Sequence, residues 1–133
     1  MRLIRYEVIT PSGNRTGLIN SVSFLNGSQY DNENDAIRHI YKLTRPFRNL
    51  VDPHLANYCE FRFFFTNLGD KRFSKSIKAI AKQAKIDGWT PIKQLIVIKD
   101  KYLPKEVYRD ENQIAWYLKD IQKTPKTVTE RMI

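Results

Sequence analysis

Residues 61–88 read FRFFFTNLGDKRFSKSIKAIAKQAKIDG, an apolar run followed by an amphipathic one. Successive side chains of a strand point to opposite sides of a sheet, so three consecutive phenylalanines are typical of a strand buried on both faces. We therefore predict a central strand from Phe61 to Thr66. The segment from Asp70 to Gly88 is predicted to be a helix, and glycine is a good stop signal at its end.

Lysines recur along this predicted helix at spacings of four, three, four and three residues, and Arg72 widens their face. These lysines, named here the lysine stripe, are Lys71, Lys75, Lys78, Lys82 and Lys85. At 3.6 residues per turn the stripe forms one positive face. The opposite face is expected to pack through Phe73, Ile77, Ile80, Ala81 and Ala84. No acidic residue lies four positions away within the stripe to relieve repulsion. The stripe is thus either a solvated helix face or a binding surface.

A second group of basic residues precedes the phenylalanine strand. This group, named here the basic cluster, consists of Arg38, Lys42, Arg45 and Arg48. If the cluster and the lysine stripe faced the same side, the protein could contact several phosphates at once, and its affinity would fall steeply with salt. Aromatic side chains interleaved with such charges would favour single strands, but the phenylalanines of this chain are expected in the core.

Strands are predicted on both sides of a helical middle. The predicted strands are residues 2–10, a short one at Thr16 to Ile19, Phe61 to Thr66, Leu95 to Ile98, and a final one within Val107 to Leu118. Asp31 or Asn32 can cap a helix to Leu43 whose apolar face is Ala36, Ile37, Ile40 and Tyr41. Another helix is predicted from Pro46 to about Asn57, with a break possible at Pro53.

This order of elements indicates the α+β class. We expect a single domain over residues 1–119, built from a compact mixed β-sheet with two to three helices inserted between strands. Residues 120–133 are expected to form a tail that is either flexible or, from Thr127 to Ile133, an edge strand.

Composition limits the classes of function. The chain has 133 residues with 23 Lys and Arg against 14 acidic residues, a net charge of +9 that favours an acidic partner such as nucleic acid. Cys59 is the single cysteine and His39 and His54 are the two histidines, too few for a structural zinc site, and no metal is expected. No apolar run approaches the ~20 residues of a membrane span and no signal peptide is recognised, so we expect a cytoplasmic protein.

Three polar residues are candidates for chemistry, each with a structural alternative. Arg5 on the first strand is either a bidentate phosphate ligand or a surface arginine paired with an acid such as Glu7. Thr66 either caps the next helix or orients groups that face a ligand. Glu111 either belongs to a polar turn or is a carboxylate at the mouth of a cleft, where it could stabilise positive charge on a sugar ring.

Taken in order, these residues resemble the layout of a minimal ADP-ribosyltransferase domain. The resemblance rests on Leu3-Ile4-Arg5-Tyr6, Phe64-Phe65-Thr66 and the segment from Tyr108 to Gln113. It implies an NAD site in which Arg5, Tyr6, Thr66 and Gln113 hold the cofactor and Glu111 is catalytic. The segments 10–13 and 65–69 also resemble small proteins of bacteria and their phages.

Two functions are therefore predicted as alternatives. The first is an ADP-ribosyltransferase-like enzyme that uses NAD to modify a macromolecule, with the stripe attracting an acidic target. The second is a non-enzymatic basic protein that binds nucleic acid or a nucleoprotein complex, such as a phage-encoded inhibitor of a host defence system. Its binding residues would be Lys71, Arg72, Lys75, Lys78, Lys82 and Lys85. The oligomeric state is left open by the sequence.

Overall fold

Strand β1 (Arg2–Ile9) is the centre of the molecule in this computed structural model, which describes residues 1–21, 33–51 and 60–133. Six residues of β1, from Leu3 to Val8, are buried. One edge of β1 pairs with β4 (Thr90–Val97) over the whole length of both strands. The other edge is shared by β3 (Phe61–Phe65) near one end of β1 and β2 (Arg15–Gly17) near the other.

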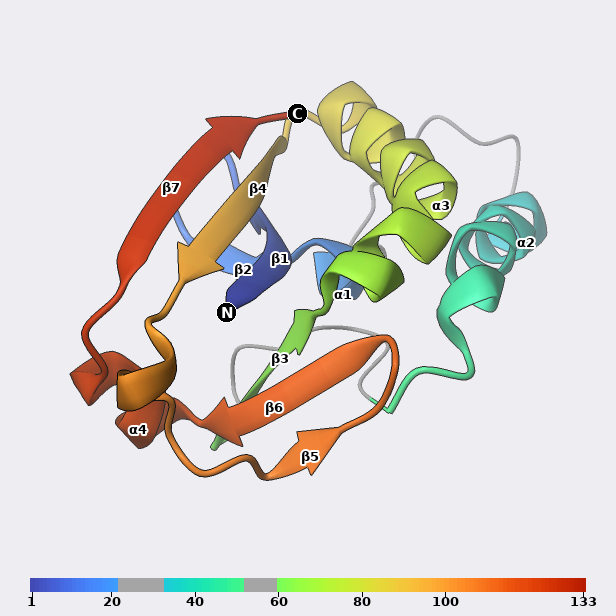
Figure 1. The fold of residues 1–133 in the computed structure, drawn as a ribbon. Coiled ribbons are helices and arrows are strands. Elements are labelled where there is room, and N and C mark those ends of the chain that lie inside the picture. The colour runs from blue at the N-terminus through green and yellow to red at the C-terminus, as the bar shows by residue number, and fades with distance from the viewer. Residues whose placement is uncertain (22–32, 52–59) are drawn as a thin grey trace.

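The sheet has the strand order β5-β6-β3-β1-β4-β7, with β2 paired to β1 beside this path (Figure 1). Its remaining strands are β5 (Tyr108–Arg109), β6 (Gln113–Tyr117) and β7 (Thr127–Met132). The α+β class is confirmed, but each strand pairing in the described residues is antiparallel, so the expected mixed sheet is wrong. The reason is that β3 and β4, which a helix connects, lie on opposite edges of β1 and never pair with each other.

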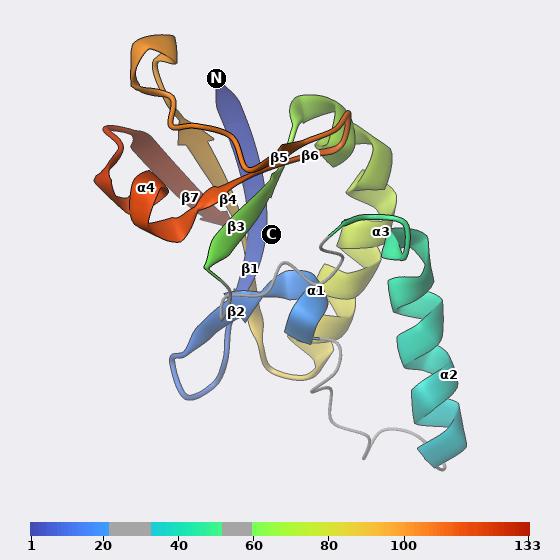
Figure 2. The same cartoon turned by 90° about the horizontal axis from the view of Figure 1, so that it is seen from below.

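Helices cover one face of the sheet. They are α1 (Leu18–Ser21), α2 (Glu33–Thr44) and α3 (Asn67–Ile86), with a 3-10 turn η3 (Arg45–Phe47) after α2. Helix α3 packs on the sheet, and α2 packs on the outer side of α3 (Figure 2). The core between them contains Ile4, Tyr6 and Val8 of β1 and the buried face of α3.

A second, smaller core lies on the opposite face of the sheet. It consists of Leu3, Phe64, Ile96, Ile98, Ile114, Trp116 and Ile121. Helix α4 (Leu118–Lys123) contributes Ile121, and a second 3-10 turn, η4 (Asp100–Tyr102), follows β4. Phe64 faces this core whereas Phe65 faces the core under α3, so the prediction of a central strand buried on both faces is confirmed.

Several predicted elements differ from those observed. The segment from Val107 to Leu118 is a hairpin rather than one strand, because the Asp110 side chain accepts hydrogen bonds from the backbone of Asn112 and Gln113 and forms a turn between β5 and β6. Strand β7 pairs with β4, so the edge-strand alternative predicted for Thr127 to Ile133 is the one observed. The short second strand ends at Gly17, where α1 begins. The predicted helix after Pro46 begins as η3, and residues 52–59 lie outside the described structure.

Candidate functional site

Helix α3 presents the lysine stripe to solvent. Thr66 caps the helix by accepting a hydrogen bond from the backbone of Gly69 at 3.0 Å. The five lysines of the stripe and Arg72 are exposed, whereas Ile77, Ile80, Ala81 and Ala84 are buried, as predicted. Phe73 is partly buried and packs against the rings of Phe47 and Phe65. The spacing of charges therefore produces one continuous basic face on a helix that is anchored from its other side.

A polar contact links α2 to α3. His39 Nε2 lies 2.9 Å from Gln83 Oε1, and Gln83 Nε2 donates to Asp87 Oδ2 at 3.1 Å. Because the Gln83 amide nitrogen is directed to a carboxylate, its oxygen is the atom that faces His39. This assigns the ring proton to Nε2 of His39, which donates to Gln83. This contact holds α2 beside α3, so that the basic residues of the two helices lie next to each other.

A cavity of about 520 Å³ opens between α2 and α3. Its apolar lining includes Leu43, Pro46, Ala79 and Ile86. Its cationic lining comes from both helices and consists of Lys42, Lys75 and Lys82. A groove of this volume, apolar inside and positive at its edges, suits a flat apolar group that carries a negative charge.

A second cavity of about 660 Å³ adjoins the first along the end of α2 and η3. It is lined by Arg38, Tyr41, Lys42, Arg45, Pro46, Arg48 and Asn49. Lys42 and Pro46 line both cavities, so the lysine stripe and the basic cluster meet on one side of the molecule. We call the combined area, from the basic cluster across Lys75 and Lys82 to the rest of the stripe, the α2–α3 basic surface. Figures 1 and 2 both show these helices side by side at one end of the protein.

Tyr41 is a residue of this surface that the sequence analysis placed wrongly. It was expected on the apolar face of its helix, yet its side chain is 70% exposed and lines the second cavity among arginines. The helix buries Leu43, which was not expected on that face, and partly buries Ile40, whereas Ile37 and Tyr41 are exposed. The available signal was local, because Tyr41 lies within the basic cluster, next to Lys42 and three positions after Arg38.

The structure brings together two of the residues implied by the transferase resemblance, Thr66 and Glu111. The Thr66 hydroxyl donates to the backbone carbonyl of Glu111 at 2.6 Å, and the Thr66 amide donates to the carbonyl of Asn112 at 3.0 Å. The Glu111 side chain is 72% exposed and pairs with Arg72 at 2.7 Å. These contacts join the hairpin to the start of α3, and they engage both the hydroxyl of Thr66 and the carboxylate of Glu111.

Arg5 occupies a different setting from the one expected of a phosphate ligand. Its side chain is 2% exposed, its Nε lies 3.4 Å from Glu7 Oε2, and its Nη1 donates to the carbonyl of Phe63 at 2.9 Å. The surface position that both alternatives expected is therefore wrong, whereas the pairing of Arg5 with Glu7 is present. Arg5 fills the position where β3 diverges from β1 after their pairing at Ile4 and Phe65.

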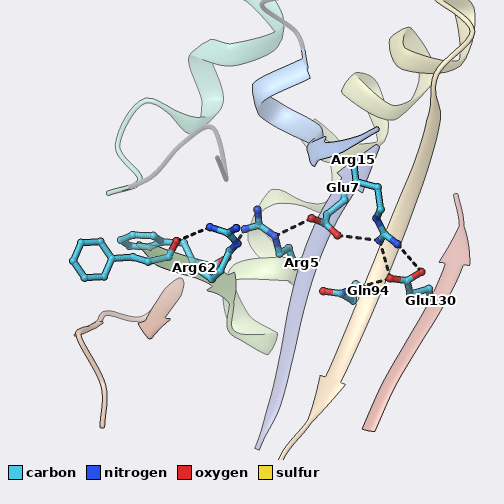
Figure 3. A network of polar contacts seen from close by, with 8 residues as sticks. Arg5, Glu7, Arg15, Arg62, Gln94 and Glu130 are labelled. Atoms are coloured by element: carbon cyan, nitrogen blue, oxygen red, sulfur yellow. Dashed lines mark hydrogen bonds and ion pairs between the residues drawn. The ribbon is translucent and has the colours of Figure 1, made fainter. Parts of the chain in front are cut away.

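The ion pair of Arg5 belongs to a chain of polar contacts that joins four strands, β1, β2, β4 and β7. Glu7 also accepts from Arg15 at 2.9 Å, and Arg15 binds Glu130 of β7 at 2.7 Å. Gln94 of β4 donates to the same carboxylate at 2.9 Å. Figure 3 shows Arg5, Glu7, Arg15 and Glu130 in a row across the sheet. The hydrogen bond from Arg15 is the main cause that holds the pKa of Glu130 below its usual value.

Tyr6 and Gln113, the other two residues assigned to NAD, also make structural contacts. The Tyr6 hydroxyl donates to Asp70 of α3, and burial together with that carboxylate raises the pKa of Tyr6 far above its usual value. Asp70 in turn pairs with Lys93 at 3.2 Å. Gln113 is fully buried, and its side-chain oxygen accepts a hydrogen bond from the backbone amide of Val51 at 3.1 Å. Tyr6 points to the face that α3 covers and Arg5 to the other, so these neighbours do not share a pocket.

Gly69 marks the closest approach between α3 and the hairpin. A Cβ atom at this position would lie 2.1 Å from the carbonyl oxygen of Asn112. Glycine to alanine inside a helix ordinarily stabilises by about 1 kcal/mol, but here the added methyl group meets backbone that other hydrogen bonds hold in place. The absence of a side chain at Gly69 therefore permits the contact between Thr66 and the hairpin.

We expect Gly69→Ala to lower the free energy of unfolding by about 1–3 kcal/mol, the usual cost of overpacking. Urea denaturation followed by circular dichroism measures this change. Ser74→Ala, in the same helix, is the control and is expected to be neutral or slightly stabilising. A Gly69→Ala variant as stable as the wild type would show that the hairpin moves away from α3 at little cost.

Comparison of the chain with protein-family models, with curated proteins and with solved structures finds no match. Among the described residues, no three His, Cys, Asp or Glu side chains gather as they would to hold a metal ion. Within those same ranges, no helix combines the length and the apolar character needed to cross a membrane. Inferences about function therefore rest on the site geometry.

Proposed function

We propose that this protein binds nucleic acid through the α2–α3 basic surface. The observation that carries the proposal is that Lys42 lines both cavities, which joins the lysine stripe to a basic cluster more than twenty residues earlier in the chain. Two groups of like charge that are held together by folding repel each other unless an anion lies between them. Phosphates of a nucleic acid supply regularly spaced charges along such a surface.

The arrangement of acidic side chains supports the same proposal. Two ion pairs of the surface join Arg38 to Asp35 at 3.7 Å and Arg72 to Glu111. Each lies at one end of the surface, while Lys75, Lys78 and Lys82 occupy its middle. A polyanion bound along the middle would release condensed counterions, and this release makes the affinity strongly dependent on salt.

An ADP-ribosyltransferase-like activity has weaker support. The contact between Thr66 and Glu111 is the observation that favours it. Against it, Arg5 is buried with Glu7, and Glu111 pairs with Arg72. A cavity of about 380 Å³ near the start of α3 mixes Arg2, Lys93 and Arg131 with Asp70 and Glu130, which gives a dinucleotide no clear excess of positive charge. We therefore keep NAD as the alternative ligand that the experiment must exclude.

The proposed function is tested by thermal unfolding in the presence of three solutes. We expect a short oligonucleotide to raise the Tm at low salt, because a ligand that binds only the folded state stabilises it by about 2.7 kcal/mol at a hundredfold excess over Kd. We expect this rise to disappear at high salt and millimolar NAD to produce none. Polyglutamate is the matched control for an acidic polypeptide.

Each outcome of that experiment has one reading. A rise with NAD alone would overturn the proposal and favour the transferase alternative, with Glu111→Ala as the next variant. A larger rise with polyglutamate than with the oligonucleotide would instead favour an acidic protein partner. A phage-encoded inhibitor that binds a host nucleoprotein complex is one form of the proposed function. Such a complex lies in the cytoplasm and presents the same phosphates. The presence of a single cysteine is compatible with that reducing compartment.

A further inference from the structure

Tyr41 gives the α2–α3 basic surface a feature that attraction to phosphates does not require. The residue is 70% exposed, although a tyrosine of an amphipathic helix usually packs against its neighbours. It lines a cavity whose other side chains are mainly cationic, with Arg38, Arg45 and Arg48 around it. An exposed aromatic ring surrounded by arginines is the combination that stacks an unpaired base while the charges hold the adjacent phosphates.

The neighbouring groove between α2 and α3 has a complementary composition. Leu43, Ala79 and Ile86 give it an apolar lining, and Ser76 supplies a polar hydroxyl within it. A base has two apolar faces and a polar edge, so it matches such a groove. In a duplex the bases are stacked and paired and cannot enter it, whereas in a single strand they can be turned outward. Lys42, which lines both cavities, lies where the phosphate between two such bases would pass.

We propose that the preferred ligand of this surface is single-stranded nucleic acid, with one base stacked on Tyr41 and a second base in the groove between α2 and α3. This inference rests on the proposed function and adds to it the class of nucleic acid. Sequence preference is not implied, because every base has a face that can stack and no described side chain is placed to read a paired base edge.

The test compares three polyanions in fluorescence anisotropy competition: an oligothymidine, a duplex of the same length and inorganic polyphosphate, which has no bases. We expect the wild type to bind the oligothymidine more tightly than the duplex. Tyr41→Ala should weaken oligothymidine binding by about 5- to 150-fold, the range measured for the loss of one stacked base. The same variant should bind polyphosphate as the wild type does.

Two further variants separate stacking from damage to the helix. Tyr41→Phe keeps the ring and should keep the affinity for oligothymidine. Ala79→Leu keeps the charge and the helix propensity but fills the groove, so it should weaken single-strand binding and leave polyphosphate binding unchanged. Tyr102→Ala is the matched control, because Tyr102 is a 42% exposed tyrosine beside Lys101 in η4, outside the surface. It is expected to change none of the three affinities.

The outcomes distinguish this inference from the proposed function. Equal affinity for duplex and single strand, with no effect of Tyr41→Ala, would overturn the single-strand inference while leaving nucleic-acid binding intact. Loss of polyphosphate binding in Tyr41→Ala would also overturn it, since stacking would not be the cause. If the wild type bound none of the three polyanions, the proposed function itself would fail.

Discussion

Reversing the charges of Lys75, Lys78 and Lys82 together to glutamate is expected to weaken nucleic-acid binding by on the order of 100-fold or more at moderate salt. These lysines are exposed and occupy the middle of the α2–α3 basic surface. Each phosphate contact that is lost removes one released counterion, so the slope of log Kd against log salt should also fall by about three. Fluorescence anisotropy over a series of salt concentrations measures both quantities.

The control variant must change the net charge by the same amount elsewhere. Lys101, Lys105 and Lys123 are exposed lysines outside this surface. Changing all three to glutamate lowers the net charge equally and is expected to leave the salt slope nearly unchanged. Similar losses of affinity in both triple variants would mean that binding depends on total charge rather than on this surface. Circular dichroism should show that α3 is intact in both variants.

Glu7→Gln is expected to have the largest effect on stability, a loss of about 3–5 kcal/mol in the free energy of unfolding. The two carboxylate oxygens of Glu7 contact different arginines, Oε2 facing Arg5 and Oε1 facing Arg15. Glutamine has nearly the same shape, but its amide nitrogen is a donor and must then face one of two guanidinium groups. The substitution also removes the negative charge beside Arg5, which is almost wholly buried. Urea denaturation provides the measurement.

Glu130→Gln is the matched control at the other end of the same chain of contacts. Glu130 binds Arg15 where both side chains are about one third exposed, so water can replace the lost interaction. We expect a loss of no more than about 1 kcal/mol. If the two variants were equally stable, the burial of the Arg5 and Glu7 pair would contribute nothing beyond a surface ion pair.

The features predicted correctly from the sequence are those that depend on neighbours along the chain. The alternation of Phe64 and Phe65 between two cores follows from the geometry of any strand, and the exposure of the lysine stripe follows from the helical repeat. Thr66 was recognised as a possible cap because its partner, Gly69, lies only three residues away. Local spacing determined each of these outcomes.

The missed turn at Asp110 was a local error, whereas the other errors concern contacts between distant segments. The burial of Arg5 depends on Phe63 and on the divergence of β3 from β1, which no local pattern encodes. Tyr41 turned outward because η3 and α3 determine which side of α2 is covered. The lysine stripe meets the basic cluster because α2 packs on α3. From the sequence it could only be said what would follow if the two groups faced the same side.

The buried pair of Arg5 and Glu7 also restricts how β1 can align with β4. Side chains alternate along a strand, so a slip of one residue would turn both charged groups into the apolar layer beneath α3 and bring Ile4 and Tyr6 to the opposite side. The ion pair of Glu7 with Arg15 would be broken at the same time. A slip of one residue is therefore penalised twice in a central strand that is otherwise rich in interchangeable aliphatic residues.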